Sequence, residues 1–488
     1  MDSRQEALTI MQALSEAGYE ALFVGGAVRD SLLGLEPKDY DIGTNATPAQ
    51  VKEVIATLNP IGFKYVLSPE AEKFNRALTS LVSAPSGEVM EVTTYRSELY
   101  GDNRADIMAT PADSFYDDSM RRDLTINALG ETEDGEIIDY HGGLEDLQNR
   151  IVRTVGNPDD RFQEDPLRII RAIRFSVKYG FSIDSETYES IVKNKDLIPT
   201  LSARRLRDEI GKVLFYPEGF TILMETGVLP ALMPEFRDLK QYEHNLQYHP
   251  EGNVYNHYIK AFRTWTKLPT RTELGGWALL FHDVAKPETA EWKGQFHTYY
   301  GHDKVGEQII LERYNNETGP FEFSRKELKS LGWTTRYHLM KFWEMKKPLK
   351  VAEMGNSEHF PLLLEVVYGD SMGDHDEDMA ARILEIEEIT KSVNDKKEKV
   401  GKRDKSFALK VRDELGLQGA EIGKALSQIE EMLSAGIVSS YDEALEVLKS
   451  KNLESEENKI SLLLPFTIGI LTTWLIFKTK PLSSRSKE

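Results

Sequence analysis

Hydrophobic periodicity divides the chain into an α/β part and a long helical part. In residues 1 to about 155, short runs with the two-residue period of a strand alternate with turn residues and short helical stretches; these runs are ALFVGG, ALTSLVSA, MEVTTY and EIIDYHG. From about residue 156 the spacing becomes helical, because Ile169, Ile170, Ile173 and Val177 form one apolar stripe. The pattern predicts an α/β head followed by an all-helical neck, body and tail that ends near residue 452.

The C-terminal part of the sequence predicts a membrane anchor. The stretch LESEENK (453 to 459) has the composition of a linker, and residues 460 to 477 contain no charged side chain. Eighteen helical residues span roughly 27 Å, close to the thickness of a bilayer core. Pro465 and Gly469 weaken this helix, so a buried helix remains the alternative.

The overall composition restricts the partners and the compartment. A formal net charge of -20 argues against indiscriminate binding of nucleic acid, whereas basic runs at 325 to 350 and 391 to 412 favour one defined polyanionic partner. The chain has no cysteine and no signal peptide at its N-terminus. We therefore expect a cytoplasmic protein, with residues 460 to 477 as the segment that would tether it to a membrane.

Two aspartates in KDYDIGT (38 to 44) suggest a metal site. In an extended strand Asp39 and Asp41 point to the same side, and two like charges are stable there only if a cation lies between them. Carboxylate oxygens are the ligands that Mg2+ accepts. A solvated strand edge is the alternative for a lone Asp-x-Asp.

Neighbouring residues strengthen the metal interpretation. Gly25 and Gly26 follow a predicted strand and precede a predicted helix that carries Arg29, an arrangement that presents backbone N-H groups to a phosphate. In EVTTYR (91 to 96), strand alternation sends Glu91 to one face, so Glu91 is a third carboxylate if this strand lies beside the first. Two metals held there could support in-line attack on an α-phosphate.

Six ordered motifs resemble one family. They are GGAVRD, KDYDIGT, EVTTYR, RRDLTINAL, DYHGGLEDL and EDPLRIIRAIRF, and they are similar to motifs of the class II tRNA nucleotidyltransferases (CCA-adding enzymes) and of bacterial poly(A) polymerases. The resemblance implies a polymerase-beta-like palm in which Asp39 and Asp41 hold catalytic Mg2+, with Glu91 as a third catalytic carboxylate. It also implies a set of nucleotide-binding residues: Gly25, Gly26, Arg29, Arg96, Arg121, Arg122, Asp123, Asn127, Glu164, Asp165, Arg168 and Arg171.

The implied base-recognition residues suit C and A. Cytosine and adenine each present an amino donor beside a ring-nitrogen acceptor, whereas uracil and guanine do not. Asp165 can accept from the amino group while Arg168 donates to the ring nitrogen, and Glu164 belongs to the same motif. A helix salt bridge between Asp165 and Arg168 is the structural alternative.

The sequence leaves several nucleotide products possible for the head. The 24 residues between Arg96 and Arg121 are rich in Gly, Asp, Asn and Pro and predict a mobile loop. Such a loop is typical of relatives that add A as well as C, which favours CCA addition to the 3' end of tRNA from CTP and ATP. An A-adding tRNA enzyme and a poly(A) polymerase are the alternatives.

Nine of the ten histidines lie between residues 244 and 375. Imidazoles and carboxylates on separate helices can converge on a divalent ion, although a single histidine is more often a surface or hydrogen-bonded residue. HPEGNVYNH, LLFHDVAKP, YYGHDKVGEQ and VVYGDSMGD together resemble the HD phosphohydrolase superfamily. The resemblance implies a Mg, Mn or Ni site made by His257, His282, Asp283 and Asp370, with His302 as an accessory group and Asp374 and Asp376 as rivals of Asp370.

The resemblance implies that this domain hydrolyses phosphoester ends such as 2',3'-cyclic phosphates on RNA. A degenerate HD fold that only binds RNA is one alternative, and a protein that is mainly a hydrolase with an RNA-binding head is another. A membrane-tethered RNA-binding protein without turnover is the third. The expected domains are the palm (1 to 155), the neck (156 to 240), the HD domain (241 to 385), a tRNA-binding tail with GLQGAEIGKAL (386 to 452), a linker (453 to 459) and the anchor (460 to 477).

Overall fold

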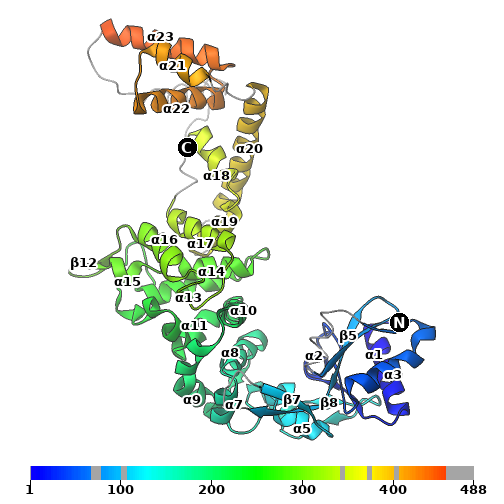
Figure 1. Ribbon diagram of the computed structural model, residues 1–488. Helices are drawn as coiled ribbons and strands as arrows, with labels where there is room; N and C mark the ends of the chain where they lie inside the picture. Colours follow the sequence, from blue (N-terminus) through cyan, green and yellow to red (C-terminus); the bar gives the residue numbers. More distant parts are fainter. Residues whose placement is uncertain are drawn as a thin grey trace, which may run out of the picture. The chain divides into compact units, whose positions relative to one another are not determined.

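The computed structural model describes residues 2–66, 78–100, 107–340, 347–370, 376–400 and 406–457. These residues fall into two compact units, each of which is described by itself (Figure 1). The first unit comprises Met1–Met340 and Glu358–Asp376, and the second comprises Lys341–Ser357 and Glu377–Glu488. The first unit begins with an α/β head and continues as helices, which confirms the fold class predicted from the periodicity.

A seven-stranded mixed sheet forms the centre of the head. Its strand order is β3-β4-β5-β2-β1-β8-β9, and β2 with β5 is the parallel pair among antiparallel neighbours. The strands are β1 (Ala21–Val24), β2 (Ile42–Thr44), β3 (Lys64–Tyr65), β4 (Thr79–Ser83), β5 (Val89–Thr94), β8 (Gly130–Glu131) and β9 (Ile137–Ile138).

Helices α1 (Ser3–Glu16) and α3 (Pro48–Thr57) pack on each other and on this sheet, as Figure 1 shows in blue. The apolar residues of α1 recur at helical spacing and enter the same core as the strand residues Phe23, Ile42 and Val92. A second cluster, on the other side of these strands, contains Leu22, Val24, Tyr95, Ala112 and Phe115. The two faces of the sheet are therefore built from alternating positions of the same strands.

The segment expected as a mobile loop contains regular structure. Strand β6 (Arg96–Tyr100) pairs with β7 (Ile107–Pro111) as an antiparallel hairpin, and helix α5 (Phe115–Met120) follows. The loop prediction was wrong for these residues, because cross-strand pairing from Arg96 with Pro111 to Tyr100 with Ile107 holds two segments as strands. The tip itself, residues 101–106, lies outside the described residues.

The neck joins the head through short elements and then becomes helical. Its helices bury the apolar stripe predicted for Ile169, Ile170 and Ile173. The short elements of the head are α2 (Gly26–Leu32) and η1 (Asn59–Ile61), and those near the neck are η2 (Thr125–Asn127), α6 (Gly143–Asn149), β10 (Ile151–Val152) and β11 (Ser182–Ile183). The neck elements are α7 (Pro158–Glu164), α8 (Leu167–Tyr179), α9 (Ser185–Asn194), η3 (Lys195–Thr200), α10 (Ala203–Leu214), α11 (Gly219–Glu225), α12 (Val228–Leu232), η4 (Pro234–Phe236) and η5 (Leu239–Gln241).

The body is the helical part of the first unit that follows the neck. Helix α14 packs against α10, α17 and α19, and α13 packs against α19. Trp265, Trp277 and Phe281 are fully buried between these helices. The body elements are α13 (Val254–Trp265), α14 (Glu273–Phe281), α15 (Lys286–Thr289), β12 (Glu291–Trp292), β13 (His297–Thr298), α16 (His302–Arg313), α17 (Arg325–Tyr337) and α19 (Phe360–Asp370).

The second unit is helical in its described part. It contains α18 (Pro348–Gly355), α20 (Asp376–Val400), α21 (Phe407–Leu415), α22 (Ala420–Ala435) and α23 (Tyr441–Glu457). Helix α23 runs into the stretch expected as a linker, because LESEE contains good helix formers and no Gly or Pro. Residues 460 to 477 lie outside the described residues, and within the described ranges no helix is both long and apolar enough to cross a bilayer.

Candidate active sites in the head and the body

Three carboxylates lie close to two neighbouring strands in the head, with Asp39 and Asp41 just before β2 and Glu91 within β5. In the parallel pairing of β2 with β5, Ile42 is opposite Val92, so Asp41 and Glu91 each directly precede a paired residue. Ile42 and Val92 are buried in the core, and alternation places Asp41 and Glu91 on the opposite face of the sheet. We call Asp39, Asp41 and Glu91 the carboxylate cluster.

Electrostatic repulsion is concentrated in the carboxylate cluster. Burial and the nearby charges of Asp39 and Glu91 raise the pKa of Asp41 to about 6, while Arg122 acts in the opposite direction. Burial and Asp39 also raise the pKa of Glu91. A divalent cation would relieve this repulsion, and oxygen ligands from carboxylates fit Mg2+. The residues present therefore fit the metal that the sequence predicts.

The strand expected to carry both aspartates is shorter than predicted. Strand β2 begins at Ile42, so Asp39 and Asp41 precede it, although the Asp41 carbonyl still accepts a hydrogen bond from the Val24 amide (3.0 Å). The neighbouring strand β1 ends at Val24, and the chain turns at Gly25 with a φ of 69°. Residues before Asp41 consequently have no strand beside them on this side.

A chain of polar contacts connects α2, η2 and α8. Arg29 Nη1 donates to Asn127 Oδ1 (2.5 Å), Asn127 Nδ2 donates to Asp123 Oδ1 (3.0 Å), and Arg171 Nε donates to Asp123 Oδ2 (2.6 Å). Although burial raises it, the Arg171 guanidinium and the Asn127 amide hold the pKa of Asp123 below its usual range. Four predicted nucleotide-binding residues thus form one buried network that joins head and neck.

Asp118 organises the two arginines of the RRD motif. Its Oδ1 atom lies 2.7 Å from Arg121 Nη2 and its Oδ2 atom lies 2.9 Å from Arg122 Nη2. Arg121 Nε also donates to the carbonyl of Arg96 (3.1 Å). Asp118 was not predicted from the sequence, although its spacing of three and four residues before the two arginines was a usable signal.

The glycine turn lies against Arg122. A Cβ atom at Gly25 would come 3.0 Å from Arg122 Nη1, and the positive φ of Gly25 disfavours other residues. Gly26 begins α2, while the Gly25 amide donates to the Leu129 carbonyl (3.3 Å). The positive φ is therefore the main reason for a glycine at position 25, and the phosphate-binding role of this turn stays a prediction.

The predicted base-recognition residues have different partners from those considered on sequence. Asp165 Oδ2 lies 2.7 Å from Arg205 Nη2, and Arg168 Nη1 lies 2.5 Å from Glu164 Oε2. Arg168 Nη2 also donates to the carbonyl of Arg121 (2.7 Å). The salt bridge between Asp165 and Arg168 that was the structural alternative is not formed. Arg205, forty residues away in the chain, was not anticipated.

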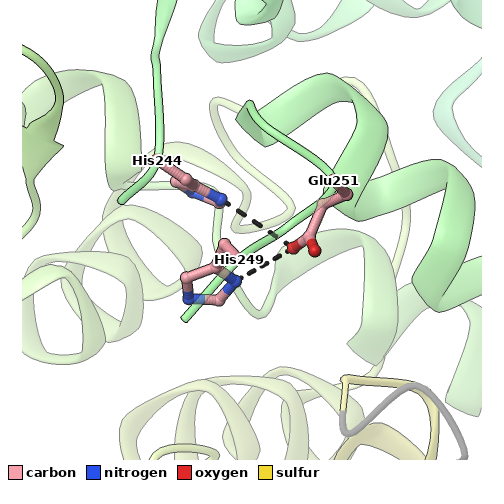
Figure 2. A group of neighbouring side chains, drawn as sticks. All are labelled: His244, His249 and Glu251. Carbon is pink, nitrogen blue, oxygen red and sulfur yellow. Dashed lines mark hydrogen bonds and ion pairs between the residues drawn. The ribbon is translucent and has the colours of Figure 1, made fainter. Parts of the chain in front are cut away.

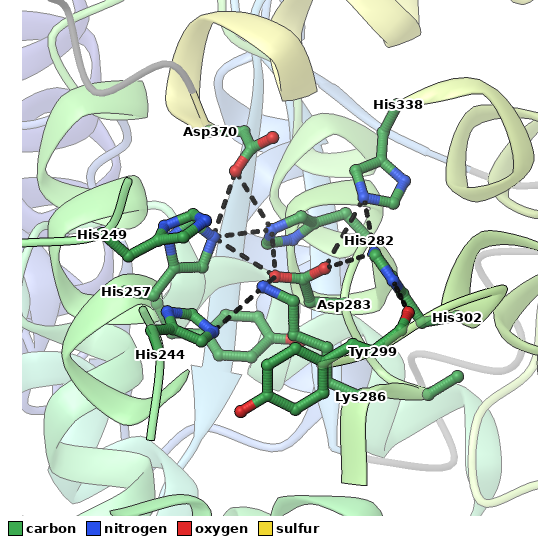
Figure 3. A network of polar contacts seen from close by, with 12 residues as sticks. His244, His249, His257, His282, Asp283, Lys286, Tyr299, His302, His338 and Asp370 are labelled. Carbon is green, nitrogen blue, oxygen red and sulfur yellow. Dashed lines mark hydrogen bonds and ion pairs between the residues drawn. The ribbon is translucent and has the colours of Figure 1, made fainter. Parts of the chain in front are cut away.

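The body brings the four predicted metal ligands together, as Figure 3 shows. His257 Nε2 lies 3.3 Å from His282 Nε2, 3.2 Å from Asp283 Oδ2 and 3.0 Å from Asp370 Oδ1. His282 Nε2 lies 3.2 Å from Asp283 Oδ2 and 3.6 Å from Asp370 Oδ1. Atoms that share one metal at about 2.1 Å lie roughly 3.0 to 3.5 Å from one another, so these four donors have the required spacing.

Asp283 links this group to a second one. Its other oxygen, Oδ1, lies 3.1 Å from His302 Nε2 and 3.5 Å from His338 Nε2, and the two imidazole nitrogens are 3.3 Å apart. Figure 3 shows Asp283 between the two groups. We call the six residues the histidine cluster: His257, His282, Asp283, His302, His338 and Asp370. His338 was missed on sequence, because no local motif marks it.

Hydrogen bonds fix the orientation of the four imidazoles. The Nδ1 atoms of His282, His302 and His338 lie 2.6, 2.7 and 2.7 Å from the backbone carbonyl oxygen three residues earlier. His257 Nδ1 lies 3.1 Å from Glu251 Oε1. With Nδ1 used as the donor, each ring directs Nε2 into the cluster, which is the arrangement found for metal-binding histidines.

Glu251 holds a further histidine beside the cluster. One of its oxygens, Oε1, lies 2.9 Å from His249 Nδ1 and 4.0 Å from His244 Nδ1 (Figure 2). Because the same oxygen contacts His257, this group orients a residue of the histidine cluster. Lys286 Nζ lies 3.3 Å from His244 Nε2.

The buried carboxylate of Asp283 fits a cation. Its Oδ2 atom lies 2.5 Å from Lys286 Nζ and 3.2 Å from the Nε2 atoms of both His257 and His282. A buried carboxylate is stable when such donors or a metal ion compensate its charge. The donor set of the histidine cluster therefore fits a divalent transition metal.

Comparison with known proteins places the head and neck in one family. Residues 21–153 match the model of the poly A polymerase head domain, and residues 180–239 match that of the probable RNA and SrmB-binding site of polymerase A. The chain is 41% identical over 238 residues to a CCA-adding enzyme of Geobacillus sp. (strain WCH70), covering 48% of this chain and 55% of that protein. It is 36% identical over 300 residues to the CCA-adding enzyme of Geobacillus thermodenitrificans, covering 59% of this chain and 66% of that one. The matched part thus spans about 55 to 66% of these relatives.

A solved structure extends the likeness to the helical part. The crystal structure of the Bacillus stearothermophilus CCA-adding enzyme in complex with CTP aligns with a TM-score of 0.67 and 25% identity, covering 94% of this chain and 100% of that one. The order of the motifs, the head sheet and these likenesses agree. Over residues 21–153 and 180–239, the head and neck of the chain are similar to the tRNA nucleotidyltransferases and bacterial poly(A) polymerases.

Proposed function

We propose that this protein adds CCA to the 3' end of tRNA, using CTP and ATP. The carboxylate cluster carries this proposal, because Asp41 before β2 and Glu91 within β5 come from distant motifs and the charge of Asp39 acts on both. The relatives named as CCA-adding enzymes support the same reaction.

In this proposal, separate groups of head residues bind the metal, the triphosphate and the sugar. Asp39 and Asp41 hold Mg2+, with Glu91 beside them, and the metal supplies the Lewis acidity that activates the terminal hydroxyl and stabilises the leaving pyrophosphate. Arg121 and Arg122, oriented by Asp118, contact the triphosphate. The polar network between α2 and α8 holds the nucleotide sugar. Its members are Arg29, Asp123, Asn127 and Arg171.

Asp165 and Arg168 select the incoming base. Arg168 is oriented by Glu164 and by the Arg121 carbonyl, and Asp165 is oriented by Arg205. Asp165 accepts from the amino group shared by C and A, and Arg168 donates to the ring nitrogen. The contact between Arg168 and Arg121 ties base selection to the residues that hold the phosphates.

Incorporation of labelled nucleotides tests this function. Three synthetic tRNAs ending before the first C, after one C and after both C residues are incubated with Mg2+ and each NTP separately. Addition of C, C and A followed by a stop supports the proposal. Extension of the third tRNA alone would identify an A-adding enzyme, and a long A ladder would identify a poly(A) polymerase.

We infer a second activity, metal-dependent hydrolysis of phosphoester ends, for the histidine cluster. The observation that favours it is the convergence of four imidazole Nε2 atoms on the two oxygens of Asp283. A divalent metal such as Mg, Mn or Ni bound there would supply Lewis acidity for attack by water. The water oxygen bonds to phosphorus, the P-O bond to the 2' or 3' oxygen breaks, and that oxygen takes a proton.

Hydrolysis of 2',3'-cyclic phosphates is measured with the full chain and with the His282→Ala, Asp283→Ala double variant. Loss of hydrolysis with retained nucleotide addition supports two separate activities. Loss of both with an unchanged melting curve would favour the view that the protein is mainly a hydrolase with an RNA-binding head. Absence of hydrolysis in the unaltered chain would leave a helical body that only binds RNA.

Membrane attachment rests on residues 460 to 477 alone, which contain no charge. We propose it as a property of the sequence, tested by fractionation of the full chain beside a chain truncated after Lys459. Equal recovery in the soluble fraction would contradict it.

A further inference from the structure

A line of aromatic rings leads from the protein surface to the histidine cluster. The Trp292 ring lies 4.9 Å from the His297 ring, which lies 6.2 Å from Tyr299 in a stacked arrangement. Tyr299 lies 5.4 Å from His244, and His244 lies 5.6 Å from His257 of the histidine cluster. We call Trp292, His297, Tyr299 and His244 the aromatic ladder.

The exposed fraction of the side chains decreases along the aromatic ladder from Trp292 to His244. Trp292 is 54% exposed, His297 and Tyr299 are partly buried, and His244 is 3% exposed. An indole that is more than half exposed leaves one flat apolar face on which a planar ligand can stack. The ladder thus connects an outer binding surface to an inner chemical site.

Backbone contacts hold the aromatic ladder in place. Trp292 and His297 are directly opposite each other in the β12–β13 pair. The backbone of Glu243 holds the two middle residues of the ladder. Its amide donates to His297 Nδ1 (3.2 Å), and its carbonyl accepts from the Tyr299 hydroxyl (3.1 Å). Rigid rings lose little conformational entropy when a ligand stacks on them.

A positive charge lies at the inner end of the ladder. Lys286 Nζ is 5.5 Å from the centre of the Tyr299 ring and is nearly buried beside His244, as Figure 3 shows. The ladder therefore offers flat rings at the surface and, inside, an ammonium group that is paired with Asp283. That order matches a ligand with bases at one end and a phosphate at the other, which is the chemistry of a single-stranded RNA end.

We propose that the aromatic ladder binds the unpaired bases of a single-stranded RNA end whose terminal phosphate lies at the histidine cluster. This inference rests on the phosphohydrolase activity proposed above and names its substrate class. A base stacks on Trp292 and His297 whatever its identity, because every base has a π face. The site would then favour RNA ends over small phosphoesters.

Two substrates that share a cyclic phosphate distinguish binding of bases by the aromatic ladder from the hydrolysis reaction. One is a single-stranded tetraribonucleotide that ends in a 2',3'-cyclic phosphate, and the other is glycerol 1,2-cyclic phosphate, which has no base. The full chain is compared with its Trp292→Ala and Trp292→Phe variants in the presence of Mn2+. Tyr300→Ala is the matched control, because Tyr300 is 83% exposed in the same segment and forms no ring contact with the ladder in the described structure.

Trp292→Ala is expected to raise the KM for the tetranucleotide about tenfold with little change in kcat. The KM for glycerol 1,2-cyclic phosphate should not change, and Trp292→Phe should restore most of the affinity. An unchanged tetranucleotide KM, an equal rise for both substrates, or an equal effect of Tyr300→Ala would overturn the inference.

Binding without turnover gives a second readout. Fluorescence anisotropy of a labelled tetranucleotide with a 3'-phosphate is measured in EDTA, so that it does not depend on a bound metal. Weaker binding by Trp292→Ala alone supports the RNA-end site, and equal binding by all variants contradicts it. Absence of hydrolysis in the unaltered chain would instead contradict the phosphohydrolase activity, so the two failures are distinct.

Discussion

The carboxylate cluster and the histidine cluster bring metal-binding side chains together in different ways. In the head, Asp41 and Glu91 are brought together by parallel pairing of two short strands, and Glu91 is exposed. In the body, His257 lies on α13, whereas His282 and Asp283 directly follow α14, and all three are buried. The head site is open and composed of like charges, whereas the body site is closed and its members neutralise one another.

This difference has a consequence for how each site behaves without metal. The head carboxylates repel one another, which raises the pKa of Asp41 to about 6. In the body, burial lowers the pKa values of the His257 and His282 imidazoles, but contacts with the carboxylates of Asp283 and Asp370 raise them more, so protonated rings would take the place of a cation. An open oxygen site exchanges its metal easily, and a closed nitrogen site must first lose protons.

The largest expected effect comes from Asp41→Asn. Loss of one carboxylate ligand should lower nucleotide incorporation about 1000-fold, because several kcal/mol of metal-dependent stabilisation are removed. Hydrolysis of cyclic phosphates should stay within about twofold if the two sites are independent. Single-turnover incorporation and cyclic-phosphate assays measure both. Glu53→Gln, an exposed acid on α3, is the control, and equal activity of Asp41→Asn and Glu53→Gln would refute the assignment.

Asp283→Asn should have the converse effect. This one substitution changes the carboxylate that contacts both groups of the histidine cluster. We therefore expect at least a 100-fold loss of hydrolysis and a loss of tightly bound divalent metal. CCA addition should remain. Metal content by mass spectrometry and circular dichroism accompany the assay, because Asp283 is buried beside Lys286. Retained metal with lost hydrolysis would contradict a ligand role for Asp283.

The pH dependence of metal binding distinguishes the two clusters. Although burial and Lys286 lower it, hydrogen bonds to Asp283 and Asp370 raise the pKa of His257 to about 10, and similar contacts raise the pKa of His282 to about 9. At pH 7 these protons must leave before a metal binds, so affinity should rise about tenfold per pH unit for each proton released.

The head should behave differently, because Asp41 is already ionised above its pKa of about 6. Its Mg2+ affinity should be nearly constant above pH 7 and should fall below pH 6 as Asp41 becomes protonated. Calorimetric titrations with metal from pH 5.5 to 8.5 test this difference. Asp283→Asn retains the head site, and Asp41→Asn retains the body site, so each variant reports on one site. Parallel pH profiles for the two variants would remove the distinction.

The smallest effects test whether head and body unfold separately. Thr47 forms a capping box with Gln50 on α3, and Ser324 forms one with Glu327 on α17. Thr47→Ala and Ser324→Ala should each cost about 1 kcal/mol of local stability. Hydrogen exchange should show faster amide exchange in the head for the first and in the body for the second. Faster exchange throughout the molecule in either variant would indicate one cooperative unit.

Much of the architecture could be predicted because it depends on local periodicity. Two-residue alternation identified the segments of β1, β4 and β5, and the helical stripe of Ile169, Ile170 and Ile173 became the buried face of α8. The hairpin after Arg96 was missed, since the turn residues at its tip concealed two short strands that stabilise each other.

By itself the sequence determined the helical and strand segments, the motif residues and the types of chemistry that they carry. Only the tertiary structure decided which distant side chains meet: Arg205 with Asp165, and His338 with the second oxygen of Asp283. The physical reason is that periodicity reports which face of an element is apolar, whereas a contact of about 3 Å depends on how packed elements are positioned by the whole core.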